Sequence, residues 1–254
     1  MTSSTPPSAN PASVRRRKRE RVSLGNLMPN PISLSDMPAM YLNIYEALRE
    51  GIIAGGVRPG QTLSNRAIAA HLGVSTTPVR DALRRLAADG VLQTLPKSAF
   101  RVPVISAERY AQILELRVLL ERFAADRAAQ AIDRATLKRL TEINARYANA
   151  SLSQDERLLA NREFHFTIYR ASLMDDLVSL IELLWVRIGP LLNFTTSSAD
   201  QSVGLQHHKD LIAALRQKDG PAAARAVEAD LRYAAKSIMT GLQREKDVAS
   251  RQAS

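Results

Sequence analysis

Short helical segments separated by glycine are crowded into residues 38–90, and this spacing limits the fold more than any other feature of the chain. Apolar residues at helical spacing predict helices over 38–54, 65–72 and 76–89. Ser64 and Ser75 are the predicted N-caps of the second and third helices, and Gly55 and Gly73 end the first and second. Because helices this short gain their stability by packing, the pattern predicts a three-helix unit.

Two short strands are predicted directly after the third helix. Residues 91–95 and 100–104 read as strands, and the segment 96–99 forms the turn between them. Helix, helix, turn, helix and hairpin follow one another within about 65 residues, which is the order of a winged helix-turn-helix. We therefore predict this domain over residues 37–105, in a chain that is mainly α.

The predicted third helix carries the side chains that a DNA-reading helix needs. Thr76, Arg80 and Arg84 are spaced i, i+4 and i+8, so they lie roughly along one side of the helix. Arginine binds O6 and N7 of guanine as a fork in the major groove. The predicted DNA contacts are Ser75, Thr76, Thr77, Arg80 and Arg84, with Lys97 at the tip of the wing. The alternative is that the arginines only coat a solvated helix face.

Positive charge is concentrated in the first part of the chain. Residues 1–105 hold 14 Lys+Arg against six Asp+Glu, and so carry +8 of the net charge of +10. A basic cluster over residues 15–21 follows a Ser- and Pro-rich start, so we expect residues 1–36 to form a disordered arm. The arm either contacts phosphates or only keeps the chain soluble. The asymmetry predicts a polyanionic partner for the N-terminal part.

The composition also excludes several kinds of site. The chain has no cysteine, which rules out disulfides, a thiolate nucleophile and cysteine-based zinc or iron–sulfur sites. No run approaches the roughly 18 consecutive apolar residues of a transmembrane helix, and the N-terminus lacks the apolar stretch of a secretory signal. We expect a cytoplasmic protein with no membrane partner.

The rest of the chain, from residue 106, shows helical periodicity and no strand pattern. Six helical segments are predicted, near residues 106–130, 134–150, 154–172, 175–194, 202–218 and 220–246. Pro190 is expected to kink the fourth segment. The breaks between segments predict an antiparallel six-helix bundle over residues 106–246, followed by a tail over 247–254.

The N-terminal unit resembles the winged-helix domain of the GntR family of transcription regulators. The resemblance is carried by Pro59-Gly60-Gln61-Thr62-Leu63 and by residues 72–83, at the family's spacing. It implies operator contacts from Arg66, Thr77 and Arg80 in a homodimer on a pseudo-palindromic site. Thr76 and Ala99 stand where the family usually has Arg and Gly, and a left-handed turn at Ala99 would be costly.

The C-terminal part resembles the FadR-like ligand-binding domain (FCD type) of the same family. The similar segments are residues 115–121, 161–165 and 208–215, and Asp219. In the metal-binding members of this subfamily, one Asp and three His hold the metal. The resemblance implies a ligand set of Asn161, His165, His208 and Asp230, in which Asn161 replaces the Asp and Asp230 replaces the third His.

The residue types in this set suit a divalent metal. Asn161 and His165 are i, i+4 on one helix and point the same way. Two imidazoles, one carboxylate and one amide oxygen can ligate Zn²⁺, Ni²⁺ or Mn²⁺. The alternatives are a hydrogen-bonded core role for His165, an exposed helix start for His208 and a surface position for Asp230.

Arg117 is the first candidate for binding an effector. Apolar neighbours predict that it faces the bundle interior, where an Arg can clamp the carboxylate of a small organic acid. Trp185 and Arg187 are expected to line the same cavity. The alternative for Arg117 is a salt bridge to Glu115, Glu121 or a later acidic residue.

These observations predict a DNA-binding transcription regulator whose DNA affinity responds to a small organic acid in the C-terminal bundle. Repression relieved by effector is the commoner mode that the resemblance implies. One alternative is a metal-dependent enzyme tethered to DNA, and another is a DNA-organising protein with a purely structural bundle. The sequence contains no Walker A, dinucleotide, Gly-x-Ser-x-Gly or His-Glu-x-x-His motif, so we predict no enzymatic activity.

Overall fold

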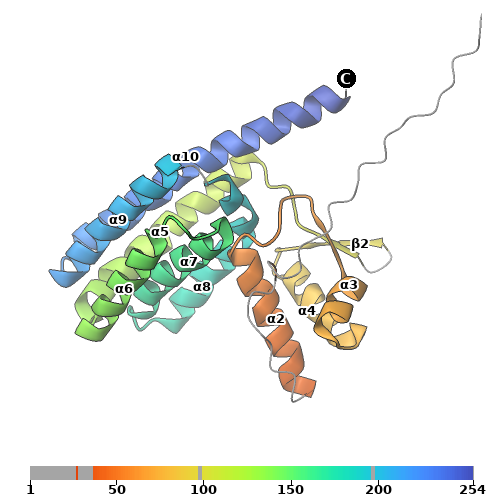
Figure 1. The fold of residues 1–254 in the computed structure, drawn as a ribbon, viewed down its shortest axis with the longest axis horizontal. Helices are drawn as coiled ribbons and strands as arrows, with labels where there is room; N and C mark the ends of the chain where they lie inside the picture. Colours follow the sequence, from red (N-terminus) through yellow and green to blue (C-terminus); the bar gives the residue numbers. More distant parts are fainter. Residues whose placement is uncertain (1–26, 28–36, 97–98, 196–197, 254) are drawn as a thin grey trace, which may run out of the picture.

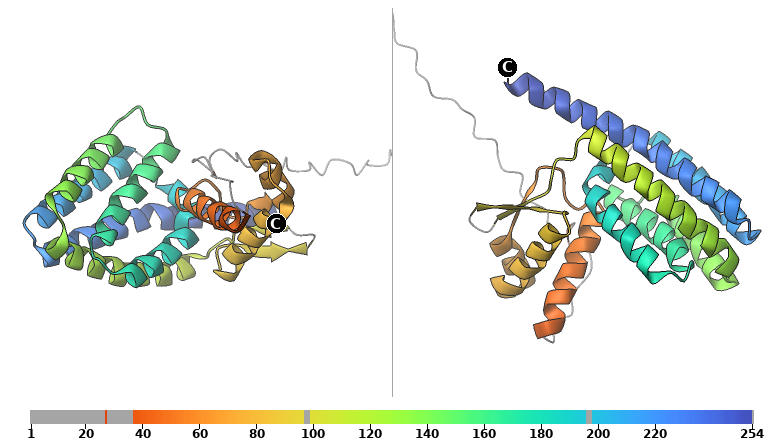
Figure 2. Two further views of the ribbon diagram at one scale, coloured as in Figure 1. Left: turned by 90° about the horizontal axis from the view of Figure 1, so that it is seen from below. Right: turned by 180° about the vertical axis from the view of Figure 1, so that it is seen from behind.

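The computed structural model describes residue 27 and residues 37–96, 99–195 and 198–253 (Figure 1). A small unit of helices and strands lies beside one end of a larger bundle of helices (Figures 1 and 2). The predicted mainly α fold, with an N-terminal winged helix-turn-helix and a C-terminal helical domain, is confirmed. A single hydrophobic core cluster extends through both parts.

Three helices build the N-terminal unit: α2 (Met37–Ile53), α3 (Asn65–Leu72) and α4 (Thr76–Ala88). The predicted caps explain the bounds of α3. The Ser64 hydroxyl accepts a hydrogen bond from the Ala67 N–H, and Gly73 adopts the left-handed conformation with a φ of 67°. α4 buries Val79 and Leu83 in the core, which leaves its opposite face exposed.

A three-stranded antiparallel sheet completes this unit. It contains β1 (Thr62–Ser64), β2 (Gln93–Leu95) and β3 (Ala99–Arg101), in the order β1-β3-β2. The sequence predicted the two hairpin strands but not β1. Three residues are too few for alternation between exposed and buried side chains to be recognised in a sequence. The predicted bounds 91–95 and 100–104 are also wrong, because β2 begins at Gln93 and β3 runs from Ala99 to Arg101.

Ala99 does not adopt the left-handed conformation that would be costly for an alanine. Ala99 is the first residue of β3 and pairs with Ser64 and Leu95. Among the described residues other than glycine, only Leu173 and Lys218 have positive φ. The replacement of Gly by Ala therefore introduces no left-handed strain at residue 99.

The six predicted helical segments of the bundle are confirmed. They are α5 (Ala107–Ala131), α6 (Arg134–Tyr147), α7 (Gln154–Arg170), α8 (Asp175–Ile188), α9 (Ser198–Arg216) and α10 (Gly220–Ala253). Side-chain caps set several starts: Ser106 for α5, Asp133 for α6, and a capping box of Ser153 and Glu156 for α7. α10 packs along α5 and α9 over much of its length (Figure 1).

Two helix ends differ from the prediction. Pro190 does not kink a continuous helix. Instead, α8 ends at Ile188 and a 3₁₀ helix, η2 (Gly189–Phe194), follows with Pro190 in its first turn. At the end of the chain, α10 continues to Ala253, seven residues beyond the predicted boundary at residue 246. Most of this extension is exposed, so neighbouring helices do not mark where α10 ends.

Residues 175–194, which form α8 and η2, are long and apolar enough to cross a membrane by composition alone, with a mean hydropathy of 1.5. Packing accounts for this composition, because 61% of the apolar window is buried inside the protein. Ile181, Trp185 and Ile188 are among its buried side chains. α8 therefore has the composition of a core helix in a bundle.

The N-terminal unit is attached to the bundle by α2, which packs against α4 on one side and against α8 and η2 on the other. The Asn193 side-chain amide donates hydrogen bonds to the carbonyl oxygens of Gly55 (2.8 Å) and Val57 (3.2 Å), in the loop after α2. An ion pair joins Arg49 of α2 to Glu182 of α8. Polar contacts therefore reinforce the apolar contact between the two parts.

Candidate functional site

The N-terminal end of α4 exposes the predicted DNA-reading side chains. Ser75, Thr76 and Thr77 are all exposed, and the Ser75 side chain makes no capping hydrogen bond. The first N–H groups of an α-helix have no partner within the helix. Together with the Ser75 hydroxyl, they form a place where a DNA phosphate can bind.

Arg80 and Arg84 continue this surface along α4. Their side chains are 40% and 63% exposed, and the Asp81 carboxylate lies 3.9 and 3.8 Å from their guanidinium groups. Ion pairs this exposed contribute little, so both cations are available to a ligand. Arg66 is also exposed, on α3. Lys97 and the basic cluster over residues 15–21 lie outside the residues that the structure describes.

Arg85 differs from its neighbours on α4. Its guanidinium group lies 4.5 Å from the centre of the Tyr45 ring on α2, where it makes a cation–π contact. Arg85 therefore helps to hold α4 against α2. This placement separates it from the residues that can reach a groove.

The bundle brings three of the four predicted metal ligands together. His165 of α7, His208 of α9 and Asp230 of α10 place their ligand atoms within 4.8 Å of one another. Nε2 of His165 lies 3.2 Å from Oδ2 of Asp230. Both histidines are about 1% exposed, and the Asp230 side chain is 16% exposed. We call these three residues the His/Asp cluster.

The electrostatics around His208 and Asp230 favour the protonation states that bind metal. Burial, and to a smaller extent the neighbouring His165, lowers the pKa of His208 to about 3, so its imidazole is neutral at pH 7. Burial by itself raises the pKa of Asp230, but the contact with His165 and the nearby imidazoles bring it below the usual carboxyl value. A neutral imidazole and an ionised carboxylate are the forms that bind divalent metals.

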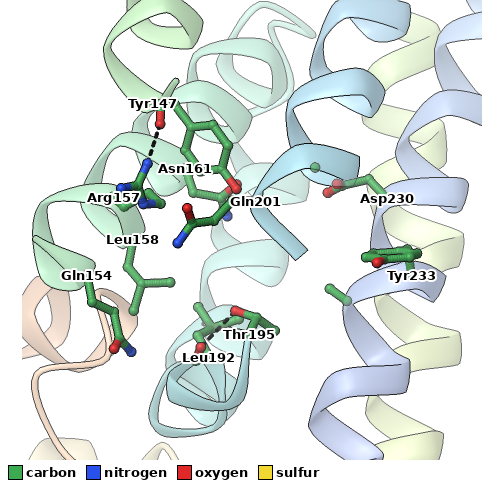
Figure 3. A pocket seen from close by; sticks show the side chains of 12 residues that line it. Tyr147, Gln154, Arg157, Leu158, Asn161, Leu192, Thr195, Gln201, Asp230 and Tyr233 are labelled. Carbon is green, nitrogen blue, oxygen red and sulfur yellow. Dashed lines mark hydrogen bonds between the residues drawn. The ribbon is translucent and has the colours of Figure 1, made fainter. Parts of the chain in front are cut away.

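A pocket of about 70 Å³ adjoins the cluster (Figure 3). α7 supplies Arg157, Leu158 and Asn161 to one wall, and α10 supplies Asp230 and Tyr233 to the opposite wall (Figure 3). The remaining lining residues are Tyr147, Gln154, Leu192, Thr195, Gln201, Gly204 and Ala234. Asp230 belongs to both the pocket and the His/Asp cluster, so a pocket ligand has access to the cluster. Asn161 lines the pocket one turn before His165.

Arg117 does not clamp a ligand in this pocket. Its Nε donates to Oε1 of Glu121 at 2.6 Å, and both side chains are buried. The salt bridge to Glu121 was one of the alternatives open in the sequence, and the structure supports it. A carboxylate already neutralises Arg117, and Arg117 does not line this pocket, so the structure gives no support to an effector clamp at this residue.

Trp185 and Arg187 also lie away from the pocket lining. The indole Nε1 of Trp185 donates to Oε1 of Glu121 at 3.0 Å, and its ring stacks under the Arg117 guanidinium group at 4.6 Å. The Arg187 guanidinium group donates two hydrogen bonds, of 3.1 and 2.9 Å, to the carbonyl oxygen of Asp89 at the end of α4. Trp185 is therefore a core residue, and Arg187 is part of the contact between the two domains.

Sequence reasoning missed four residues that surround the site. Glu121, Tyr169 and Asn144 are hydrogen-bonded around the two histidines, and Arg157 lines the pocket. Tyr169 and Arg157 were detectable in part, since they lie four residues after His165 and four before Asn161 on one helix face. Asn144 carries no such signal, because it reaches His208 from a different helix.

Comparisons with known proteins cover both parts of the chain. Residues 40–102 match the family described as "Bacterial regulatory proteins, gntR family", and residues 112–233 match the "FCD domain". The HTH-type transcriptional regulator McbR of Escherichia coli is 32% identical over 186 residues, which are 71% of this chain and 84% of McbR. The HTH-type transcriptional repressor RspR of the same species is 26% identical over 208 residues, which are 80% of this chain and 91% of RspR.

The fold agrees with these matches. The solved structure of E. coli McbR/YncC has a TM-score of 0.70 and 28% identity, and the match covers 84% of this chain and 98% of that one. The relatives are transcription regulators rather than enzymes, which contradicts the DNA-tethered enzyme considered from the sequence. The chain therefore belongs to the GntR family of bacterial regulatory proteins and is a DNA-binding transcription regulator with an FCD effector-binding domain.

Proposed function

We propose that this regulator is a metal-dependent sensor of a small organic acid, and that it represses transcription until the acid binds. The main support for this proposal is that Asp230 belongs to the His/Asp cluster and also lines the adjacent pocket. A ligand in the pocket and a metal in the cluster would therefore be in contact. The repressor role is supported by the relative RspR, an HTH-type transcriptional repressor. The cytoplasm, where the DNA is, is the proposed location.

The residues present fit a divalent metal. Nε2 of His208 is buried and has no hydrogen-bond partner among the described residues, although an unpaired buried polar atom is costly. His165 and Asp230 add a second imidazole and an anionic oxygen within reach. Two His and one carboxylate leave a coordination position open, as in zinc sites that bind a further ligand. Zn²⁺, Ni²⁺ and Mn²⁺ suit these donors. Asn161 is the proposed fourth ligand, and a five- or six-coordinate ion would then keep a position for an effector oxygen.

When bound, the metal would supply a Lewis-acidic site for an oxygen of the effector. The chain supplies the second anchor, Arg157, which carries the only positive charge among the pocket-lining residues. Its guanidinium group donates to the backbone carbonyl oxygens of Tyr147 (2.7 Å) and Leu152 (3.2 Å), which fixes its position. Its Nε is buried without a hydrogen-bond partner among the described residues. A small carboxylate suits this arrangement, with Arg157 in the role first assigned to Arg117.

The proposed DNA-binding form is a homodimer. Leu116, Leu119 and Phe123 are 51%, 66% and 47% exposed on α5, at a spacing of three and four residues that places them on one helix face. A contiguous exposed apolar stripe of this kind suits burial against a second copy of the chain. Leu119→Glu should shift the protein from dimer toward monomer in analytical ultracentrifugation. Leu173→Glu, at a more exposed position outside this stripe, should not.

Metal analysis of the purified protein tests the central proposal. After removal of metal with a chelator and reloading with Zn²⁺, wild type is expected to hold one ion per protomer. His208→Ala should lose it, whereas His207→Ala, which changes the adjacent residue outside the His/Asp cluster, should retain it. Equal zinc content in the two variants would rule out the assigned ligands.

DNA binding provides the second readout. Fragments selected from a random-sequence pool should bind wild type more tightly than bulk DNA, and zinc together with a small dicarboxylate such as malonate or succinate should lower that affinity. Tight binding with no sequence preference and no response to zinc would favour the DNA-organising alternative. It would contradict the regulator that we propose.

A further inference from the structure

We infer that Tyr169, held by Glu121, and Asn144 are positioning residues for the two cluster histidines. Each places a hydrogen-bond acceptor at Nδ1 of one imidazole, so that Nε2 is the nitrogen left to bind metal. The inference deepens the proposed metal site and assigns a function to buried groups that contact neither the metal nor the effector. It predicts that the ligand set is oriented before metal arrives.

The His165 side of this arrangement follows from counting hydrogens. The Tyr169 hydroxyl donates to Oε2 of Glu121 at 2.5 Å, and its oxygen lies 3.2 Å from Nδ1 of His165. A tyrosine hydroxyl has a single hydrogen. Because Glu121 takes that hydrogen, the hydroxyl oxygen can only accept from His165. Nδ1 therefore carries the proton, and Nε2 faces Asp230.

Glu121 is fixed as an acceptor by its other partners. Arg117 donates to both of its carboxylate oxygens, at 2.6 and 3.3 Å, and Trp185 donates to Oε1 at 3.0 Å. The Glu121 side chain is fully buried, so its position does not depend on solvent. A carboxylate surrounded by donors in this way cannot itself donate to Tyr169. The direction of the Tyr169 hydrogen bond is thus determined by residues of α5 and α8.

The His208 side uses a different residue for the same purpose. Oδ1 of Asn144 lies 3.0 Å from Nδ1 of His208, and an amide oxygen only accepts. Nδ1 of His208 is therefore the donor, which leaves a lone pair on the unpartnered Nε2. The Phe164 ring stacks on the imidazole with a centroid distance of 3.9 Å and an interplanar angle of 17°, so the ring plane is also fixed.

With both Nδ1 atoms protonated, the atoms that face one another in the His/Asp cluster are hydrogen-bond acceptors, and a cation between them would be favourable. Nε2 of His165 faces a carboxylate oxygen of Asp230 at 3.2 Å, and Nε2 of His208 is close by. Only a proton or a metal ion can lie between two such acceptors without repulsion. Groups that orient metal-binding histidines typically change metal affinity by roughly 10- to 100-fold when they are lost.

The test compares two tyrosines of similar burial. Tyr169→Phe keeps the ring and removes the hydroxyl, and Tyr110→Phe makes the same change at a buried tyrosine of α5 that is not part of the His/Asp cluster. We expect Tyr169→Phe to weaken Zn²⁺ binding by roughly 10- to 100-fold in competition with a chelator. Tyr110→Phe should bind Zn²⁺ as wild type does.

A spectroscopic readout separates positioning from general destabilisation. In metal-free protein labelled with ¹⁵N-histidine, NMR should show a proton on Nδ1 of His165 in wild type, and its partial loss in Tyr169→Phe. A His165 Nδ1 without a proton in wild type would overturn the inference, as would unchanged zinc affinity in Tyr169→Phe. If wild type shows the Nδ1 proton but binds no zinc, the proposed metal function fails while the positioning role stands.

A second pair of variants tests the same idea on His208. Asn144→Asp keeps an acceptor oxygen and should keep the proton on Nδ1, whereas Asn144→Leu should lose this preference and weaken zinc binding. This pair also decides the question if Tyr169→Phe fails to fold. Equal zinc affinity for Asn144→Asp and Asn144→Leu would contradict the assignment.

Discussion

The charged side chains of α4 and those of the bundle differ in exposure and in pairing. On α4, Arg80 and Arg84 are 40% and 63% exposed and only loosely paired with Asp81, so they are free to exchange water for a DNA partner. In the bundle, Arg117 and Glu121 are 4% and 0% exposed and are connected through Tyr169 to His165. α4 therefore keeps its charges available to a ligand, whereas the bundle uses buried charges to hold side chains in place. Substitutions should therefore separate binding from stability on α4 but not in the bundle.

The largest expected effect tests the buried side of this comparison. Glu121→Ala removes the carboxylate and leaves the Arg117 guanidinium buried without its partner, which should cost about 3–5 kcal/mol in the free energy of unfolding. Urea denaturation measures this loss. Glu115→Ala removes an exposed carboxylate from the same helix and should change stability little. Similar losses in the two variants would show that burial does not distinguish these charges.

The exposed side predicts a loss of binding without a loss of stability. Arg80→Ala should lower affinity for a selected operator by about 1–3 kcal/mol, or roughly 5- to 150-fold, if the side chain binds a base edge. The thermal midpoint should stay unchanged. Arg216→Ala removes one positive charge from α9 in the bundle and is the control, measured by fluorescence anisotropy at fixed salt. Equal operator affinity for Arg80→Ala and wild type would exclude Arg80 as a reader.

Acid should destabilise the metal-free bundle through His208. The pKa of this residue is about 3 when folded, below its ordinary value of 6.5 in an unfolded chain, because the site is buried. The unfolded state therefore takes up a proton first as the pH falls, and stability is lost between pH 6.5 and 3. By pH 5 the loss should be about 2 kcal/mol. His208→Phe should remove this part of the pH dependence in urea titrations, while His207→Phe should preserve it.

The smallest expected effect lies at the contact between the two regions. Arg187→Ala removes two hydrogen bonds to the Asp89 carbonyl oxygen at the end of α4, which should cost about 1 kcal/mol at this half-buried site. Zinc content should not change. The effect of zinc on operator affinity should become smaller, because α4 is less firmly attached to α8. An unchanged response to zinc would place the connection between sensor and reader elsewhere.

The sequence predicted the helices correctly where capping residues mark their ends. Ser64, Gly73, Ser106 and Asp133 mark helix ends through interactions with neighbouring backbone groups, and the helices start and end close to these residues. β1 and the end of α10 carried no such signal. A three-residue strand exists only because β3 lies beside it, and the described residues of the last turns of α10 are exposed, so no buried face marks where the helix ends.

The site was predictable only in part, because its geometry depends on helices far apart in sequence. His165, His208 and Asp230 were identified by resemblance, and the bundle does bring them together. Arg117 was assigned to a ligand because its apolar surroundings showed burial but not its partner. The partner, Glu121, lies only one turn away, and the sequence alone did not rank it above a ligand carboxylate.

The hydrogen bonds from Asn193 to the loop after α2 suggest a way to follow ligand binding in the pocket. Leu192 and Thr195, on either side of Asn193 in the chain, both line the pocket, and Gln154 of the pocket wall donates to the Asn193 side chain at 3.3 Å. The loop at Gly55 and Val57 is therefore held by a segment that borders the ligand site. Amide hydrogen exchange in this loop should therefore slow when a ligand fills the pocket. Mass spectrometry of peptides from the loop would then detect a bound ligand without a DNA-binding assay.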